Sequence, residues 1–195
     1  MSIRATVAFL VTALAFVLLN TASAEEENSP INALMGDLVR GEEWLTPNPD
    51  YEPGGQQPKD WGVRYRWGPY KQHVTGELFG VFLPSDDSSG GETREVQYWT
   101  LYAFYNPVTK MGSALQVNWT GSFADGDMYL DDTGRLVMDQ TFFGVDGSAK
   151  EVRHLFVMDE SGESHSADVY EKNESGEWVK MRDWVWTRKS SQEQE

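Results

Sequence analysis

From Trp61 onward, short hydrophobic stretches alternate with polar clusters rich in glycine, aspartate, asparagine and serine. The hydrophobic stretches are enriched in valine, threonine and aromatic residues, which favour β-strands, and the clusters between them favour turns. The pattern predicts nine strands, at residues 61–68, 71–83, 93–105, 110–119, 123–130, 135–144, 149–158, 164–171 and 177–188.

The connections between these strands are short, which favours an antiparallel meander. Asp146-Gly147 is a strong hairpin signal, because a type I′ turn needs positive φ at both central residues. A long meander with free edges is prone to aggregation, and closure removes the edges. We therefore expect an all-β protein: a single up-and-down antiparallel β-barrel of about nine strands, with a two-sheet sandwich as the alternative.

One short α-helix is predicted before the barrel, at residues 29–41. Ser29 suits the N-cap and Pro30 the first helical position, and Gly41 can end the helix in a left-handed conformation. An apolar stripe at helical spacing comprises Ile31, Leu34, Met35 and Leu38. Prolines and glycines make residues 46–58 irregular. We expect the apolar stripe to pack on the barrel, across one end or along its outer wall.

Some predicted strands are apolar on both faces. In residues 96–105 and in Trp184-Val185-Trp186, large apolar side chains point to both sides of the strand, whereas a barrel wall that faces water should alternate. Two explanations are open. Either the helix and the proline-rich segment cover part of the outer wall, or the protein forms a homo-oligomer.

The start of the chain has the layout of a cleavable export signal. Arg4 precedes an apolar stretch at residues 5–19, and Ala22-Ser23-Ala24 fits signal peptidase. The apolar stretch is shorter than the ~20 residues that a membrane-spanning helix needs. We therefore expect a soluble exported protein, periplasmic or secreted. The predicted organisation is a signal peptide (1–24), a helix with a Pro/Gly-rich segment (25–60), a barrel domain (61–189) and a polar tail (190–195).

Composition narrows the classes of function. The chain carries 31 acidic and 16 basic residues, a formal net charge of −15, which disfavours nucleic acids and anionic membrane surfaces as partners. It contains no cysteine, so thiol catalysis, disulfides and thiolate metal sites are excluded. The motifs of serine hydrolases, zinc proteases, phosphate loops and dinucleotide-binding folds are also absent from the sequence.

No metal or cofactor site is predicted. Asp125-Gly126-Asp127 and Asp131-Asp132 place carboxylates close together, but a calcium loop needs more oxygen ligands at regular spacing, and two successive turns explain them better. The histidines are far apart in the sequence. One of them, His165, lies between Ser164 and Ser166 and is predicted to be at the surface.

Four residues on apolar strand faces form the predicted ligand-binding site: Gln140, His154, Arg182 and Trp184. Alternate residues of a barrel strand face the lumen, and a buried polar group there needs a partner. We predict that the four line one cavity, in which Arg182 binds an anionic headgroup, because an unpaired buried guanidinium is not tolerated. Trp184 would form an apolar wall. As an alternative, His154 is a core histidine bonded to a backbone carbonyl.

A leading helix followed by a β-meander with an aromatic last strand resembles the calycin superfamily of lipocalin-like barrels, in particular its exported bacterial members. The resemblance is carried by residues 61–70, which form the opening strand and turn, by Tyr105-Asn106-Pro107, which end an aromatic strand, and by Gly176-Glu177-Trp178, which lead into the last strand. It covers residues 61–189 and implies a barrel that holds a small apolar or amphipathic ligand.

Two other functions remain open at this point. One is a barrel-fold lyase or isomerase that uses histidine, tyrosine and carboxylate side chains as acid and base. The other is a structural or oligomerising protein with a filled core. The volume of the lumen distinguishes the last of these from the other two.

Overall fold

The computed structural model describes residues 30–84 and 93–189. Ser29, the predicted signal peptide and the polar tail lie outside the described residues. Within the described ranges, every helix is too short or too polar to cross a bilayer.

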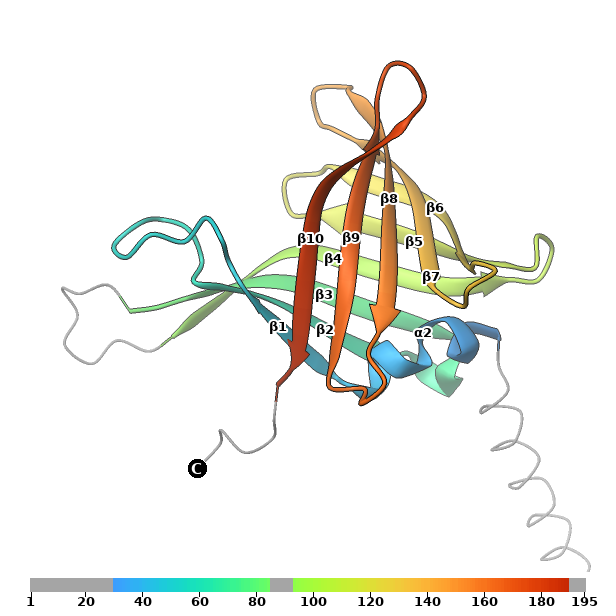
Figure 1. Ribbon diagram of the computed structural model, residues 1–195, viewed down its shortest axis with the longest axis horizontal. Helices are drawn as coiled ribbons and strands as arrows, with labels where there is room; N and C mark the ends of the chain where they lie inside the picture. The colour runs from blue at the N-terminus through green and yellow to red at the C-terminus, as the bar shows by residue number, and fades with distance from the viewer. Residues whose placement is uncertain (1–29, 85–92, 190–195) are drawn as a thin grey trace, which may run out of the picture.

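The described chain forms one closed antiparallel β-barrel of ten strands in up-and-down order, with a short α-helix before it (Figure 1). Consecutive strands pair along the chain, and the last strand pairs with the first, so the barrel has no free edge. This confirms the predicted fold class. The elements in chain order are α2 (Pro30–Arg40), β1 (Glu43–Pro47), β2 (Asp60–Trp67), the 3-10 helix η1 (Pro69–Lys71), β3 (His73–Phe82), β4 (Arg94–Asn106), β5 (Met111–Asn118), β6 (Phe123–Leu130), β7 (Leu136–Phe143), β8 (Ala149–Met158), β9 (Ser164–Lys172) and β10 (Trp178–Arg188).

The strand that sequence analysis misses is β1. It has five residues, ends in a proline and follows the helix almost directly, so it is too short to show a clear alternating pattern. It pairs with β2 over its whole length and with β10 through Trp44↔Arg188 and Leu45↔Thr187. The barrel therefore begins at Glu43, inside the segment that the sequence assigns to helix and irregular chain.

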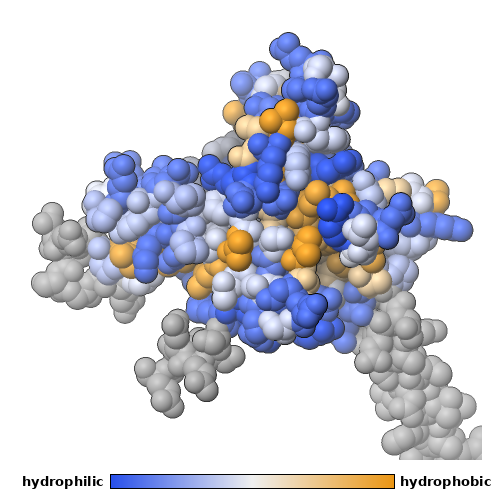
Figure 2. Space-filling view, viewed as in Figure 1, coloured by the Kyte–Doolittle hydropathy of each residue, from blue (hydrophilic) through white to orange (hydrophobic). Residues whose placement is uncertain are grey.

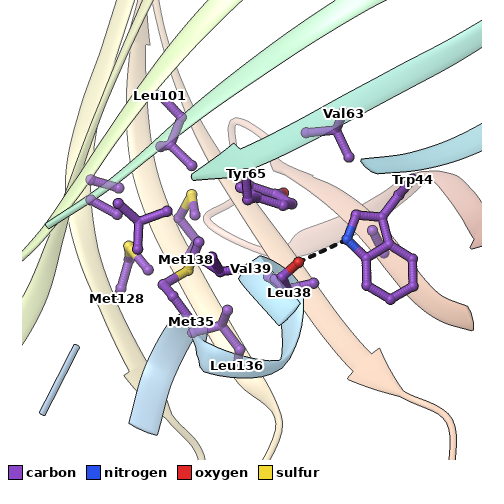
Figure 3. Packing of buried hydrophobic residues seen from close by; sticks show 14 of the residues in the cluster. Met35, Leu38, Val39, Trp44, Val63, Tyr65, Leu101, Met128, Leu136 and Met138 are labelled. Carbon is purple, nitrogen blue, oxygen red and sulfur yellow. Dashed lines mark hydrogen bonds between the residues drawn. The ribbon is translucent and has the colours of Figure 1, made fainter. Parts of the chain in front are cut away.

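Helix α2 closes one end of the barrel, where it lies against β2 to β6. Figure 3 shows Met35 of the helix among Met128, Leu136 and Met138 of the barrel, all of which are buried. The indole Nε1 of the fully buried Trp44 donates a hydrogen bond to the carbonyl oxygen of Leu38 at 2.9 Å. Other buried helix residues are Ile31, Leu38 and Val39, and Leu34 packs against them while partly buried. The helix thus covers an end of the barrel and not its outer wall.

The end of the helix differs from the prediction. The residue in the left-handed region is Glu42, with φ of 60°, and not Gly41. Glycine is required at position 41 for space, because a Cβ atom there would overlap the indole ring of Trp44. Gly41 therefore allows the tryptophan to lie directly against the backbone that follows the helix.

The hairpin at Asp146-Gly147 is confirmed, but its predicted turn type is wrong. Only Gly147 has positive φ (83°), and its N–H donates to the carbonyl of Gly144 at 3.0 Å. This is the arrangement of a turn followed by one left-handed glycine. Gly134, Gly162 and Gly176 also have positive φ, and the N–H of each donates to the carbonyl of the residue three positions earlier. Of the two acidic clusters predicted to be turns, Asp131-Asp132 is in such a turn, but residues 125–127 lie within β6.

The outer wall mixes charged and apolar residues. The face in Figure 2 is mostly hydrophilic, with separate hydrophobic groups between the charged ones. The residues of β4 that point outward remain partly exposed, with Tyr102 at 43% and Phe104 at 44%. Because these outward side chains are not covered, self-association stays a prediction for the strands that are apolar on both faces.

Candidate ligand-binding cavity

The barrel lumen contains a cavity of about 270 Å³. Toward the helix it is bounded by Tyr65, Leu101 and Met138, which belong to the packed core. Toward the opposite end it extends to Trp61 and Arg182. The lumen is therefore filled near the helix and hollow beyond it. The lining includes six tryptophan, tyrosine and phenylalanine residues: Trp61, Tyr65, Trp99, Phe156, Trp184 and Trp186.

Small side chains create the space in this part of the lumen. Gly76 of β3 and Ala167 of β9 face the cavity, where larger side chains would fill it. A Cβ atom at position 76 would also approach the Tyr65 ring to 3.0 Å. The volume is thus set by residue sizes on strands that are distant in the sequence.

Three rows of paired residues on β8, β9 and β10 run along one side of the lumen, and all of these residues except Met158 line the cavity. From the open end toward the helix, the rows are His154–Val169–Arg182, Phe156–Ala167–Trp184 and Met158–His165–Trp186. Neighbouring strands are about 4.8 Å apart, so the backbones of His154 and Arg182 are about 10 Å apart across Val169. The structure therefore brings together three of the four predicted site residues, His154, Arg182 and Trp184.

Arg182 lies at the mouth of the cavity rather than in its interior. Its side chain is 46% exposed, its guanidinium lies 4.9 Å from the centre of the Trp184 ring, and Asp50 accepts a hydrogen bond from Nη2 at 3.5 Å. The expectation of a buried, unpaired guanidinium is wrong. At the rim the charge keeps contact with water, so it needs no buried counter-ion, and its one ion pair is long.

A β-bulge precedes Arg182. The register between β10 and β9 shifts between Lys180 and Arg182, which leaves Met181 as the extra residue. On the far side of the bulge, Lys180 forms an ion pair with Asp168 on the outer wall. The bulge therefore makes Arg182 the first residue of β10 that faces the cavity, followed by Trp184 and Trp186.

His154 faces the cavity between two phenylalanines. Its ring centre lies 6.4 Å from that of Phe142 and 6.1 Å from that of Phe156. Burial lowers the pKa of His154 from 6.5 to about 4, so the ring is neutral at pH 7. The residue as a whole is half-buried, which is consistent with access from the cavity. Within the described ranges its buried Nδ1 has no hydrogen-bond partner, so the alternative of a core histidine bonded to a backbone carbonyl has no support.

His165 was predicted at the surface, and this is wrong. It is only 2% exposed and lies between Trp44, in edge contact at 4.7 Å, and Trp186, stacked at 6.2 Å. Burial is the larger effect and lowers its pKa to about 4, whereas the backbone of Ser166 acts in the opposite direction. That backbone contact falls short of a hydrogen bond, and both ring nitrogens lack a partner among the described residues. Leaving a buried polar group unpaired costs about 1–3 kcal/mol.

Gln140, the fourth predicted residue, does not line the cavity. It is buried behind Gln116. Its Oε1 accepts a hydrogen bond from Nε2 of Gln116 at 2.6 Å, and its Nε2 donates to the carbonyl of Ala114 at 3.5 Å. Gln116 does face the cavity. Gln140 therefore fixes the orientation of a polar residue that the sequence analysis left out of the site.

The signal that could have identified His165 was strand alternation. Along β9, His165 alternates with Ser164 and Ser166 and shares its face with Ala167 and Val169. The adjacent serines suggest an exposed segment, whereas the residues two and four positions away indicate an apolar face. In this strand the residues at i+2 and i+4, and not the adjacent serines, predict the burial of His165 correctly.

The cavity carries few groups for acid–base or metal chemistry. Among the residues that the structure describes, the lining includes no carboxylate, and no cluster of histidine and acidic side chains could hold a metal ion. Burial raises the pKa of Tyr65 well above its ordinary value, so its phenol stays protonated at pH 7. The arrangement can therefore accept a ligand by shape, by ring contacts and by a few hydrogen bonds.

Comparison of the chain with protein-family models, with curated proteins and with solved structures found no match. The residues of the cavity are therefore the basis for assigning a function.

Proposed function

We propose that this chain is an exported barrel of the calycin type that binds a small amphipathic ligand with an anionic headgroup in its lumen. The observation that carries the proposal is the cavity of about 270 Å³, whose walls are aromatic and whose mouth holds a guanidinium. Ligand sites are concave and mostly apolar, with a few polar groups that fix orientation. The signal-like leader supports export.

Arg182 is suited to bind an anion at the mouth. Its ion pair with Asp50 is long, at 3.5 Å, and uses one of the five N–H donors of a guanidinium. Its contact with the Trp184 ring holds the guanidinium over the cavity wall. Since the protein is strongly acidic overall, this local positive charge distinguishes the mouth from the surrounding surface.

The geometry favours binding over the two alternatives. An acid–base enzyme would need a carboxylate in the cavity, and none of the described residues that line it carries one. Both buried histidines have pKa values near 4, which makes them poor proton carriers at pH 7. A structural protein with a filled core would not leave a lumen of this volume.

The proposal is tested by calorimetric titration of the protein with decanoate and with 2-naphthoate. We expect the wild type to bind at least one of them, and Arg182→Met to weaken that binding about tenfold or more, as loss of a charge-assisted hydrogen bond predicts. Arg66→Met is the matched control, because Arg66 is an exposed arginine on β2 away from the cavity lining, and it should bind like the wild type.

Circular dichroism checks that both variants keep the fold. If the wild type binds neither compound, the proposed function is wrong. If Arg182→Met binds as tightly as Arg66→Met, the lumen binds ligands but Arg182 is not the anchor.

A further inference from the structure

The cavity wall carries polar groups that the fold leaves unpaired, on His154 in the row nearest the mouth and on His165 in the row nearest the helix. Nδ1 of His154 and both ring nitrogens of His165 are buried without a hydrogen-bond partner among the described residues. Each neutral imidazole offers one N–H donor and one acceptor nitrogen. Buried polar side-chain atoms are nearly always paired in native proteins, so unpaired ones facing a cavity call for a partner that enters it.

The ring contacts of these histidines supply no partner. The rings around His165 are those of Trp44, Phe156 and Trp186, and those around His154 are Phe142 and Phe156. None of these contacts includes an acceptor, and the indole N–H of Trp44 is already bonded to Leu38. The backbone of Ser166 acts on His165 but is not in hydrogen-bonding geometry with either ring nitrogen. For the described part of the chain, the lumen is the remaining place from which a partner can come.

The positions of the polar groups define the two ends of an occupant. Arg182 is in the row nearest the mouth, and His165 is in the row four residues further along β9 from Val169, which is about 13 Å along the strand. Between them the walls are flat rings, including Trp61, Trp99 and Trp184. An occupant that matches all three features is anionic at one end, planar in the middle and polar at the other end.

We propose that the ligand is a planar aromatic carboxylate, or a related aromatic anion, whose far end carries a hydroxyl or another hydrogen-bonding group that pairs with the imidazole of His165. The inference rests on the proposed function and names the class of its ligand. A linear acyl chain would meet Arg182 equally well but would leave the imidazole of His165 unpaired. A planar ring system also stacks on the tryptophan walls, which a flexible chain cannot do.

The test is a calorimetric comparison of 6-hydroxy-2-naphthoate, 2-naphthoate and decanoate on the wild-type protein. We expect the hydroxylated compound to bind about tenfold more tightly than 2-naphthoate, and decanoate to bind most weakly. Equal affinity of the two naphthoates overturns the inference while the proposed function stands, because it means that the ligand hydroxyl does not pair with the buried imidazole. Tightest binding of decanoate overturns it in the same way. No binding of any of the three overturns the proposed function and the inference together.

Two variants locate the preference within the cavity. His165→Phe keeps a flat ring and removes the hydrogen-bonding nitrogens, and it should reduce the preference for the hydroxyl several-fold with little change in the affinity for 2-naphthoate. His73→Phe replaces the histidine that lies outside the cavity lining and should keep the full preference. A preference that survives His165→Phe would show that the hydroxyl pairs elsewhere, and the assignment to His165 would be wrong. If a variant fails to fold, the comparison of the two naphthoates on the wild type still decides the question.

Discussion

The two ends of this barrel are built from similar residues and serve different purposes. At the helix end, Met35, Trp44 and Met128 are fully buried, and Trp44 has its one polar atom bonded. At the other end, tryptophans such as Trp61 and Trp184 are only partly buried and border a cavity. Aromatic content alone therefore does not separate a stabilising core from a binding site.

What separates the two ends is whether each inward-facing side chain has neighbours on all sides. The helix supplies the missing neighbours at one end, whereas the small side chains of Gly76 and Ala167 leave space further along the lumen. Most dispersion contacts and buried apolar area are thus concentrated near the helix. The hollow part contributes less to stability and keeps unpaired polar atoms.

The difference in packing between the two ends is tested most directly by truncating one tryptophan at each end. Trp44→Ala removes a fully buried indole and its hydrogen bond, and we expect it to lower the free energy of unfolding by about 3–5 kcal/mol. Trp184→Ala should cost less than half as much, because that side chain already borders empty space. Urea denaturation of both variants measures the difference, and equal losses would show that the two ends are packed alike.

The second prediction concerns pH and the two buried histidines. The folded state lowers their pKa from 6.5 to about 4, so between these values the unfolded chain binds protons that the folded chain excludes. Their stabilising contribution is complete above about pH 6.5 and is lost as the pH falls toward 4, by up to about 3 kcal/mol per histidine. Urea denaturation at several pH values should show this slope in the wild type.

The double variant His154→Phe/His165→Phe should lose that part of the slope, whereas His73→Phe should retain it. A double variant that keeps the full pH dependence between 6.5 and 4 would mean that both rings are protonated as readily in the folded state as in the unfolded chain.

The smallest loss of stability is expected for a substitution at the boundary between the packed end and the hollow end. Gln140→Leu removes the acceptor that holds Gln116 at 2.6 Å, and we expect a loss of about 1 kcal/mol, since Gln116 can still reach solvent in the cavity. Thermal denaturation measures this loss. A loss as large as that of Trp44→Ala would place Gln140 in the packed core rather than at its border.

Most of the fold could be predicted from the sequence because it is encoded locally. Nine strands and the helix each carry their own periodicity and their own turn signals, and the observed elements match them within a few residues. β1 could not be predicted in this way, because five residues ending in Pro47 show no period. Its place in the sheet depends on partners in β2 and β10.

The site could be predicted only in part, for a related reason. Alternation along β8 and β10 identified inward faces for His154 and Trp184, but it does not give depth, so it could not show that Arg182 lies at the rim. It also could not show whether Gln140 faces the cavity or lies behind Gln116. These distinctions depend on the sizes of side chains from strands far apart in the chain.

The closure of the barrel between β1 and β10 has a consequence for the order of folding. This seam joins residues more than a hundred positions apart, through two register pairs, reinforced by the main-chain hydrogen bond from Lys189 to Glu43 and the ion pair between their side chains. Contacts so distant in sequence form late, because the loss of chain entropy precedes the gain. We therefore expect hydrogen exchange during refolding to protect Trp44 and Leu45 after the amides of β3 and β4. A growing chain would hold an open sheet until its last strand has been made.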